Sequence, residues 1–149
     1  MGKNQKILLR AYFSENFGDD LFVKILCSRL KNYQVETYCG EQYRNAFSDI
    51  ENLNCKSLHA RATYYCLNHT GKLYDMFFKL LDKKYSAIVQ IGGSIFVEDK
   101  NWKEKHRKYK RICETTSDYY IFGCNFGPYY HEEFLQAYKA LIDKFGLVS

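Results

Sequence analysis

The chain has 149 residues, which suits one folded domain, and 46% of them are hydrophobic, an ordinary share for a globular protein. Its net charge of +5 is mild, so charge alone does not indicate a nucleic-acid-binding protein. The sequence contains no apolar run long enough for a signal peptide or a membrane span. We therefore expect a cytoplasmic protein with no membrane span and no nucleic-acid partner.

The six cysteines show neither CxxC pairs nor the spacing of a metal site. In a domain large enough to build its own core, such scattered cysteines are expected to be reduced thiols packed as small hydrophobic groups. We therefore predict no metal site, and no cofactor is indicated. The cysteines are Cys27, Cys39, Cys55, Cys66, Cys113 and Cys124.

The first part of the chain predicts a strand, a helix and a second strand. Residues 6–12 form a mostly continuous apolar run, typical of a strand buried on both faces. After a loop over residues 13–18, a helix opens with two aspartates and closes with basic residues, as the helix dipole favours. Residues 34–38 form the next strand and complete a βαβ unit. The helix is expected to turn its regularly spaced apolar residues inward: Leu21, Phe22, Ile25, Leu26, Cys27 and Leu30.

The middle of the chain is less regular at first. Residues 40–72 carry polar breaks and weak periodicity, which predict one or two short helices. A clear helical stripe follows, and residues 85–91 then form an apolar strand that ends in two glycines and a serine. The stripe consists of Leu73, Met76, Phe77, Leu80 and Leu81.

A basic run over residues 100–111 lies within the next predicted helix, roughly 102–114. Such a run could attract nucleic acid or anionic carbohydrate, but no nucleic-acid motif accompanies it. We therefore favour a solvated helix face with Trp102, Tyr109 and Ile112 turned inward.

The C-terminal part predicts a strand over residues 119–122 and a helix over about 131–145. The apolar pair Leu147 and Val148 then resembles a strand just begun. We expect the chain to be one truncated domain, residues 1–149, of a longer α/β protein. Alternating strands and helices predict a Rossmann-like open parallel sheet with helices on both faces, in which ligands bind beyond the carboxyl ends of the strands.

Three glycine-bearing loops follow predicted strands at that edge. In the first, Gly18 permits a tight entry into the helix and Asp19 can cap its free N–H groups. A helix N-terminus attracts anions, but two adjacent carboxylates, Asp19 and Asp20, would repel a phosphate. The dinucleotide fingerprint also needs a second glycine that is absent here. This loop therefore suits a neutral, hydroxyl-rich ligand, although helix capping by Asp19 and solvation of Asp20 explain each residue taken alone.

The second loop, Gly92-Gly93-Ser94, brings backbone N–H groups and one hydroxyl close to a ligand, although flexible turns use the same residues. The third loop, residues 123–128, brackets Asn125 with Gly123 and Gly127 and ends in the only proline, Pro128. Asn125 can hydrogen-bond to a sugar or a carboxylate, or simply stabilise an Asx-type turn.

The ordered set of these loops, a strand then NFGDD and a helix, a strand then GGS, and a strand then GxNFGP, resembles the polysaccharide pyruvyl transferase family. The resemblance runs from Ile7 to Ser149 and covers the N-terminal half of the family's length. Where members often have a third glycine in the second motif, this chain has Ile91. The resemblance implies the N-terminal domain of a two-domain GT-B-type enzyme.

The resemblance also implies an activity and its residues. Members transfer a pyruvyl group from phosphoenolpyruvate to a sugar hydroxyl pair of a cell-surface polysaccharide, so phosphoenolpyruvate and a glycan acceptor are the implied partners. Asp19 and Asp20 are the implied catalytic residues. The implied substrate-binding residues are Asn16, Gly18, Gly92, Gly93, Ser94, Gly123, Asn125 and Gly127.

Phosphoenolpyruvate needs cationic residues around its carboxylate and phosphate. The resemblance implies that these lie mainly in a C-terminal domain, so the three loops are expected to face the acceptor sugar and the isolated chain to be inactive. Of the histidines, His131 follows the third loop and could reach the cleft, but a surface position at the helix start is favoured. Two alternatives stay open: half of a GT-B glycosyltransferase that uses a nucleotide sugar, and a non-catalytic fragment that binds a glycan or a partner.

Overall fold

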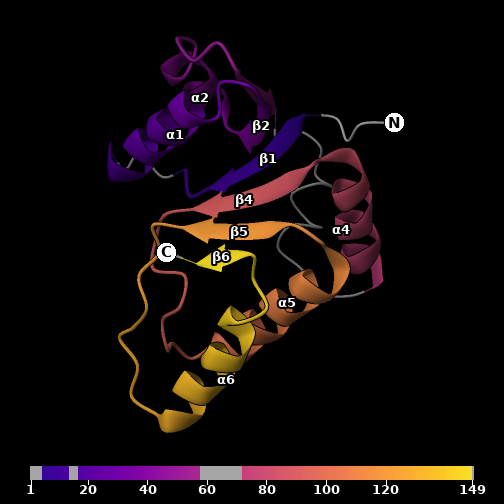
Figure 1. Ribbon diagram of the computed structural model, residues 1–149. Helices are drawn as coiled ribbons and strands as arrows, with labels where there is room; N and C mark the ends of the chain where they lie inside the picture. Colours follow the sequence, from indigo (N-terminus) through magenta and orange to yellow (C-terminus); the bar gives the residue numbers. More distant parts are fainter. Residues whose placement is uncertain (1–4, 14–16, 58–71, 149) are drawn as a thin grey trace.

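The computed structural model describes residues 5–13, 17–57 and 72–148 of the chain, which form a single sheet with helices on both faces (Figure 1). The strand order is β3-β2-β1-β4-β5-β6, and every neighbouring pair is parallel. This confirms the predicted Rossmann-like fold, because the chain order reverses between β1 and β4 as in doubly wound sheets. The strands are β1 (Lys6–Ala11), β2 (Gln34–Cys39), β3 (Leu53–Ser57), β4 (Ala87–Ile91), β5 (Tyr119–Phe122) and β6 (Leu147–Val148).

The helices form one layer on each face of the sheet, with α1 and α2 on one side and α4, α5 and α6 on the other (Figure 1). Alternate residues of β1 supply both cores: Leu8 packs with the second group of helices, while Ile7 and Leu9 pack with the first. The sheet therefore sits between two apolar layers, which explains why its central strands are apolar runs. The helices are α1 (Phe17–Arg29), α2 (Glu41–Ala46), α4 (Lys72–Lys84), α5 (Trp102–Thr115) and α6 (Glu132–Ile142).

The predicted inward face of α1 is partly wrong. Val23 and Cys27 are buried, whereas Leu21, Phe22 and Ile25 are 45%, 42% and 48% exposed. The helix carries apolar residues on almost every side, so its sequence does not define one stripe that must face the sheet.

The same kind of error affects α4, where Met76 and Leu80 are exposed while Phe78 and Leu81 are buried. Phe78 was outside the predicted stripe, although it lies between two of its members. The buried face of α4 is therefore shifted by about one residue from the predicted face.

Residues 40–72 contain the helix α2, as predicted, and also the strand β3, which was not predicted. The sequence of β3, Leu-Asn-Cys-Lys-Ser, is mostly polar and belongs to an edge strand whose residues are half-buried or exposed. Residues 58–71 lie outside the described part of the chain, and so does Cys66. None of the five described cysteines forms a disulfide.

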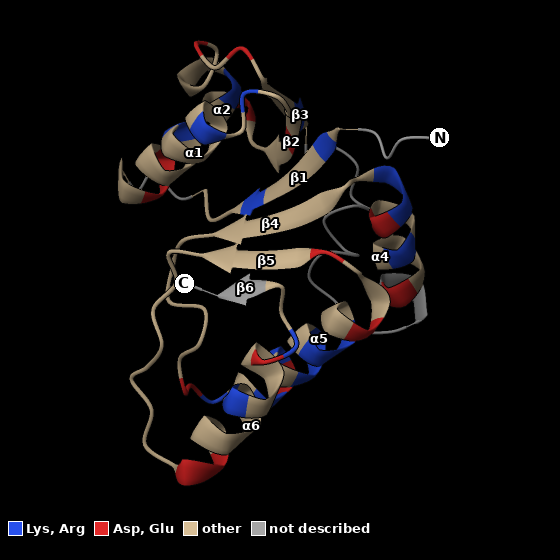
Figure 2. Ribbon diagram, viewed as in Figure 1, with Lys and Arg blue, Asp and Glu red and all other residues tan. Residues whose placement is uncertain are grey.

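The basic helix α5 has the predicted orientation. Tyr109 and Ile112 are buried, and the Trp102 ring meets Phe134 of α6 edge-on at 5.3 Å between centroids. Much of α5 is blue in Figure 2, and the start of α6 is red. Lys103 on α5 pairs with Glu133 on α6 at 2.7 Å, so part of the basic charge is neutralised within the fold.

The buried carboxylate of Glu36, on β2, is surrounded by lysine side chains on the face of the sheet that carries α4. Its Oε2 accepts hydrogen bonds from Lys56 Nζ at 2.7 Å, Lys84 Nζ at 3.1 Å and Tyr85 Oη at 2.5 Å. Burial alone would raise the pKa of Glu36, but these three hydrogen bonds outweigh burial and lower the pKa to about 2. The cluster ties β2, β3 and the end of α4 together.

Candidate functional site

A cleft of about 630 Å³ opens at the carboxyl ends of β1 and β4, the point where the strand order reverses. Ligands of open α/β sheets bind at this position, because the loops on either side of it diverge. The residues that line the cleft are Arg10, Ala11, Tyr12, Asp19, Gln90, Ile91, Gly92, Gly93, Ser94, Ile95, Lys108 and Tyr109.

The first and second predicted loops meet inside this cleft, where the carboxylate of Asp19 lies against Gly92. Asp19 is only 7% exposed. Gly92 has a φ of 75°, and a Cβ atom at this position would collide with Asp19 Oδ1. Glycine is therefore required at position 92 both for the backbone conformation and for the approach of the carboxylate.

Two details of the first loop differ from the prediction. The helix α1 begins at Phe17, so Gly18 lies in its first turn and Asp19 is inside the helix instead of capping it. Asp20 does not line the cleft, and its Oδ1 is buried with no hydrogen-bond partner among the described residues. Asn16, a predicted binding residue, lies outside the described part of the chain.

The second and third loops run side by side beyond β4 and β5. Gly92 N donates to Phe122 O at 3.0 Å, Asn125 N donates to Gly93 O at 3.3 Å, and Gly127 N donates to Phe96 O at 2.7 Å. The sheet thus continues past its last regular residues, and the two loops form one unit.

Within this unit, some of the predicted residues line the cleft and others do not. Gly93 and Ser94 line it, whereas Asn125 is exposed outside the lining. Gly123 packs on α1, since a Cβ there would come within 2.9 Å of the Phe22 ring. Gly127, which precedes Pro128, also lies outside the lining. The structure therefore brings together Asp19, Gly92, Gly93 and Ser94 of the predicted set.

Sequence reasoning missed two cations in the cleft, Arg10 and Lys108. Arg10 is on β1, in register with Gln90 of β4. Its Nη1 donates to Tyr119 Oη at 2.6 Å, Tyr119 Oη donates to Gln90 Oε1 at 2.5 Å, and Gln90 Nε2 donates to Tyr109 Oη at 2.9 Å. The guanidinium also lies over the Phe78 ring, with Cζ at 5.6 Å from the centroid.

Lys108 reaches the cleft from α5 and is half-buried there. Burial, and after it the positive charge of Arg10, lower the pKa of Lys108 from 10.5 to about 8, against the opposing effect of Glu104. Arg10 and the half-buried Lys108 thus line the same cleft.

His131 does not line the cleft, in agreement with the favoured prediction of a surface position at the helix start. It precedes α6 with a side chain that is 75% exposed, and its Nδ1 lies 2.5 Å from Glu98 Oε1. Glu98 Oε2 also accepts the backbone N–H of Tyr130 and of His131, at 2.5 and 2.9 Å. The hydrogen bonds to Glu98 lower its pKa although its burial acts in the opposite direction. These hydrogen bonds connect Glu98 to the residues that immediately precede α6.

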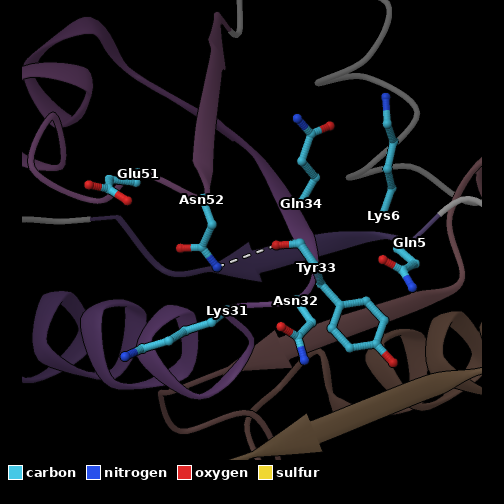
Figure 3. Close-up of a pocket in the computed structure, with 8 residues that line it drawn as sticks. All are labelled: Gln5, Lys6, Lys31, Asn32, Tyr33, Gln34, Glu51 and Asn52. Carbon is cyan, nitrogen blue, oxygen red and sulfur yellow. Dashed lines mark hydrogen bonds between the residues drawn. The ribbon is translucent and has the colours of Figure 1, made fainter.

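A second hollow lies at the opposite edge of the sheet, near the amino ends of β1 and β2 (Figure 3). Its Asn52 amide donates to the carbonyl oxygens of Cys27, Leu30 and Tyr33, the last of which is drawn in Figure 3. Asn52 therefore satisfies carbonyl groups at the end of α1, a structural task. The hollow is distant from the loops that carry glycine and aspartate.

Among the described residues, no group of three or more histidine, cysteine, aspartate or glutamate side chains could hold a metal ion. Within those same residues, no helix has both the length and the hydropathy needed to cross a membrane. Comparisons with family models, with curated proteins and with solved structures find no match to this chain.

Proposed function

We propose that this chain is the N-terminal domain of a polysaccharide pyruvyl transferase-like enzyme, and that the cleft at the carboxyl ends of β1 and β4 holds the sugar acceptor. The main support for the proposal is the close approach of the Asp19 carboxylate to Gly92, which brings two of the family-like motifs into one cleft. A carboxylate beside exposed backbone and the hydroxyl of Ser94 suits a ligand rich in hydroxyl groups.

The reaction joins two sugar hydroxyl groups to C2 of phosphoenolpyruvate and breaks the bond between C2 and the phosphate oxygen. One hydroxyl proton ends on the former methylene carbon, which becomes a methyl group, and the other ends on the released phosphate. A base near the acceptor hydroxyl assists this step, and we assign that role to Asp19, which lines the cleft. The family resemblance also implies that Asp20 is catalytic, and we keep it in the proposal although it does not line the cleft.

The test uses a full-length enzyme that contains this domain, supplied with phosphoenolpyruvate and a glycan acceptor. Phosphate release and formation of the pyruvyl ketal are measured together. Asp19→Asn and Asp20→Asn are expected to abolish both, while Asp143→Asn, at the exposed end of α6, leaves them unchanged.

Residues 1–149 alone are expected to give no turnover, because the donor half of the site belongs to another domain. Consumption of a nucleotide sugar in place of phosphoenolpyruvate would overturn the proposal in favour of a glycosyltransferase. Glycan binding without turnover by the full-length protein would overturn it in favour of a binding protein.

A further inference from the structure

The helices α4 and α5 lie side by side on one face of the sheet and share an outer surface that faces away from it (Figure 1). An ion pair joins them: Arg111 Nε donates to Asp75 Oδ1 at 3.0 Å, and Arg111 Nη2 donates to Asp75 Oδ2 at 2.5 Å. Opposite the buried residues of each helix, side chains three or four positions apart are exposed. We call this surface the α4–α5 face, and its exposed members include Met76, Lys79, Leu80, Lys83, Arg107 and Lys110.

The α4 part of this face exposes two large apolar side chains to solvent. Met76 and Leu80 are 56% and 57% exposed and lie one helical turn apart. They line an open hollow of about 370 Å³ together with Asp75, Lys79 and Lys83. On an amphipathic helix, apolar side chains flanked by lysines suit the boundary of a lipid bilayer, because the apolar groups enter the acyl layer while the ammonium groups stay at the headgroups.

The cations of the α4–α5 face are available to an external anion. Among the described residues, Lys79, Lys83 and Lys110 form no ion pair. Arg107 likewise has no carboxylate partner in the described part of the chain, and its Nε donates to the backbone oxygen of Lys103 at 3.3 Å. Figure 2 shows Lys and Arg along α5 and also on α4. The positive charge of these four side chains is therefore not neutralised by ion pairs within the described residues.

Nearby carboxylates only partly offset this charge. On α4, Asp75 is held in the ion pair with α5, and Asp82 accepts hydrogen bonds from Ser117. Glu104 and Glu114 are the exposed carboxylates in the described part of α5. The four cations of the face outnumber these two glutamates, so the face keeps a surplus of positive charge. A membrane surface with anionic lipids attracts such a surplus, and added salt screens the attraction.

We propose that the α4–α5 face docks on the surface of a lipid bilayer that contains anionic lipids, with Met76 and Leu80 among the upper acyl chains and the four cations at the headgroups. A nucleic acid would also attract the cations, but proteins bind its unpaired bases on exposed aromatic rings, and the exposed apolar residues of this face are methionine and leucine. The docking is independent of the proposed reaction, because the cleft opens at the carboxyl edge of the sheet and not on the outer side of these helices.

The test is co-sedimentation of the 149-residue chain with two kinds of lipid vesicle. One kind consists of phosphatidylcholine alone, and in the other about one lipid in three is phosphatidylglycerol, which carries a negative charge. The chain is expected to bind the anionic vesicles at least about tenfold more tightly than the neutral ones, since several basic residues contribute. Binding should weaken as salt is raised, because the Debye length shortens.

Two variants separate the apolar and the charged contributions. Leu80→Ser should weaken binding to anionic vesicles at least about fivefold, because burial of an aliphatic side chain in the acyl layer is lost. The double variant Lys79→Gln and Lys83→Gln should weaken it at least about tenfold, since each lysine near an anionic surface contributes roughly fivefold. The matched controls are Ile25→Ser on α1, at a site that is 48% exposed, and Lys31→Gln, exposed beyond the end of α1. Both should bind like the wild type, and circular dichroism checks that every variant folds.

Several results would overturn the docking. Absence of binding to anionic vesicles would do so, and so would equal binding to both kinds of vesicle. Equal weakening by Leu80→Ser and Ile25→Ser would show that the α4–α5 face is not the surface that meets the lipid. Loss of binding in the double lysine variant with no effect of Leu80→Ser would show attraction without insertion. Binding of single-stranded RNA in preference to the vesicles would assign the cations to nucleic acid instead.

Discussion

The carboxylate of Asp19 fills the space that a Cβ atom on Gly92 would occupy, so that the first turn of α1 lies against the first residue beyond β4. The contact joins two segments that are 73 positions apart in the sequence, and a side chain on residue 92 would remove it. The position of the Asp19 carboxylate in the cleft therefore depends on the absence of a Cβ atom at residue 92.

Gly92→Ala is expected to lower the free energy of unfolding by about 2 kcal/mol or more, because alanine at a φ of 75° is strained and its Cβ also displaces Asp19. Gly93→Ala is the matched control, since Gly93 has a φ of 83° and a Cβ there meets nothing within 4 Å. It should cost about 1 kcal/mol from backbone strain alone. Chemical denaturation measures both, and equal losses would show that the contact with Asp19 carries no energy.

Tyr119→Phe should disturb the support of Arg10. The substitution removes the hydroxyl that links Arg10 to Gln90, leaving partly buried polar groups without that partner, at a cost of about 1–3 kcal/mol. Tyr120→Phe is a suitable control because the Tyr120 hydroxyl makes a longer bond, 3.3 Å, to Asp118. Thermal unfolding measures stability, and the melting temperature should fall further for Tyr119→Phe than for the control. Equal melting temperatures of the two variants would contradict a supporting role for the Tyr119 hydroxyl.

Glu36→Gln should change how stability depends on pH. The pKa of Glu36 is lowered from 4.5 to about 2 in the folded chain, so its interactions stabilise the fold above pH 4.5 and are lost as pH falls from 4.5 toward 2. The variant is expected to be less stable at pH 7 by on the order of 2 kcal/mol, with a smaller further loss between pH 4.5 and 2 than the wild type. Urea denaturation across this range measures the effect. The exposed Glu51→Gln should follow the wild-type curve; a matching loss there would point to general charge effects.

Phe134→Ala tests the aromatic core under the third loop. Phe134 is fully buried, with ring centroids 5.3 Å from Trp102 and 4.6 Å from Tyr138. Truncation should cost about 3–5 kcal/mol, because the cavity lies in a packed ring cluster. Tyr130→Ala, at a site that is 75% exposed, should cost less than about 0.5 kcal/mol. Thermal denaturation compares the two variants, and similar melting temperatures would refute this account of the core.

The sequence allowed the sheet to be predicted because its central strands are apolar runs that end in glycine, as at Ile91 and Phe122. It did not reveal β3, because an edge strand that is half-buried needs no continuous apolar run and has none. It also misplaced the buried side of α1, where Leu21 and Ile25 are as apolar as the residues that pack. Where several faces are equally apolar, the tertiary contacts select one of them.

Of the residues predicted from the sequence, Asp19, Gly92, Gly93 and Ser94 line the candidate cleft, whereas its two cations were not predicted. Arg10 lies in an apolar run, and strand alternation places it on the same side of the sheet as Leu8, where its guanidinium lies over the Phe78 ring. Lys108 is one of several basic residues on α5, and only the rotation of that helix distinguishes it from Lys110. A basic residue within a strand that precedes a glycine loop was the signal that could have identified Arg10.

The joined course of the loops after β4 and β5 bears on how this sequence can change over evolution. Backbone hydrogen bonds from Asn125 to Gly93 and from Gly127 to Phe96 fix the register of the two segments. An insertion or deletion in one segment would break the register of every later pair unless the other segment changed length as well. Related sequences should therefore vary in the length of both loops together or of neither.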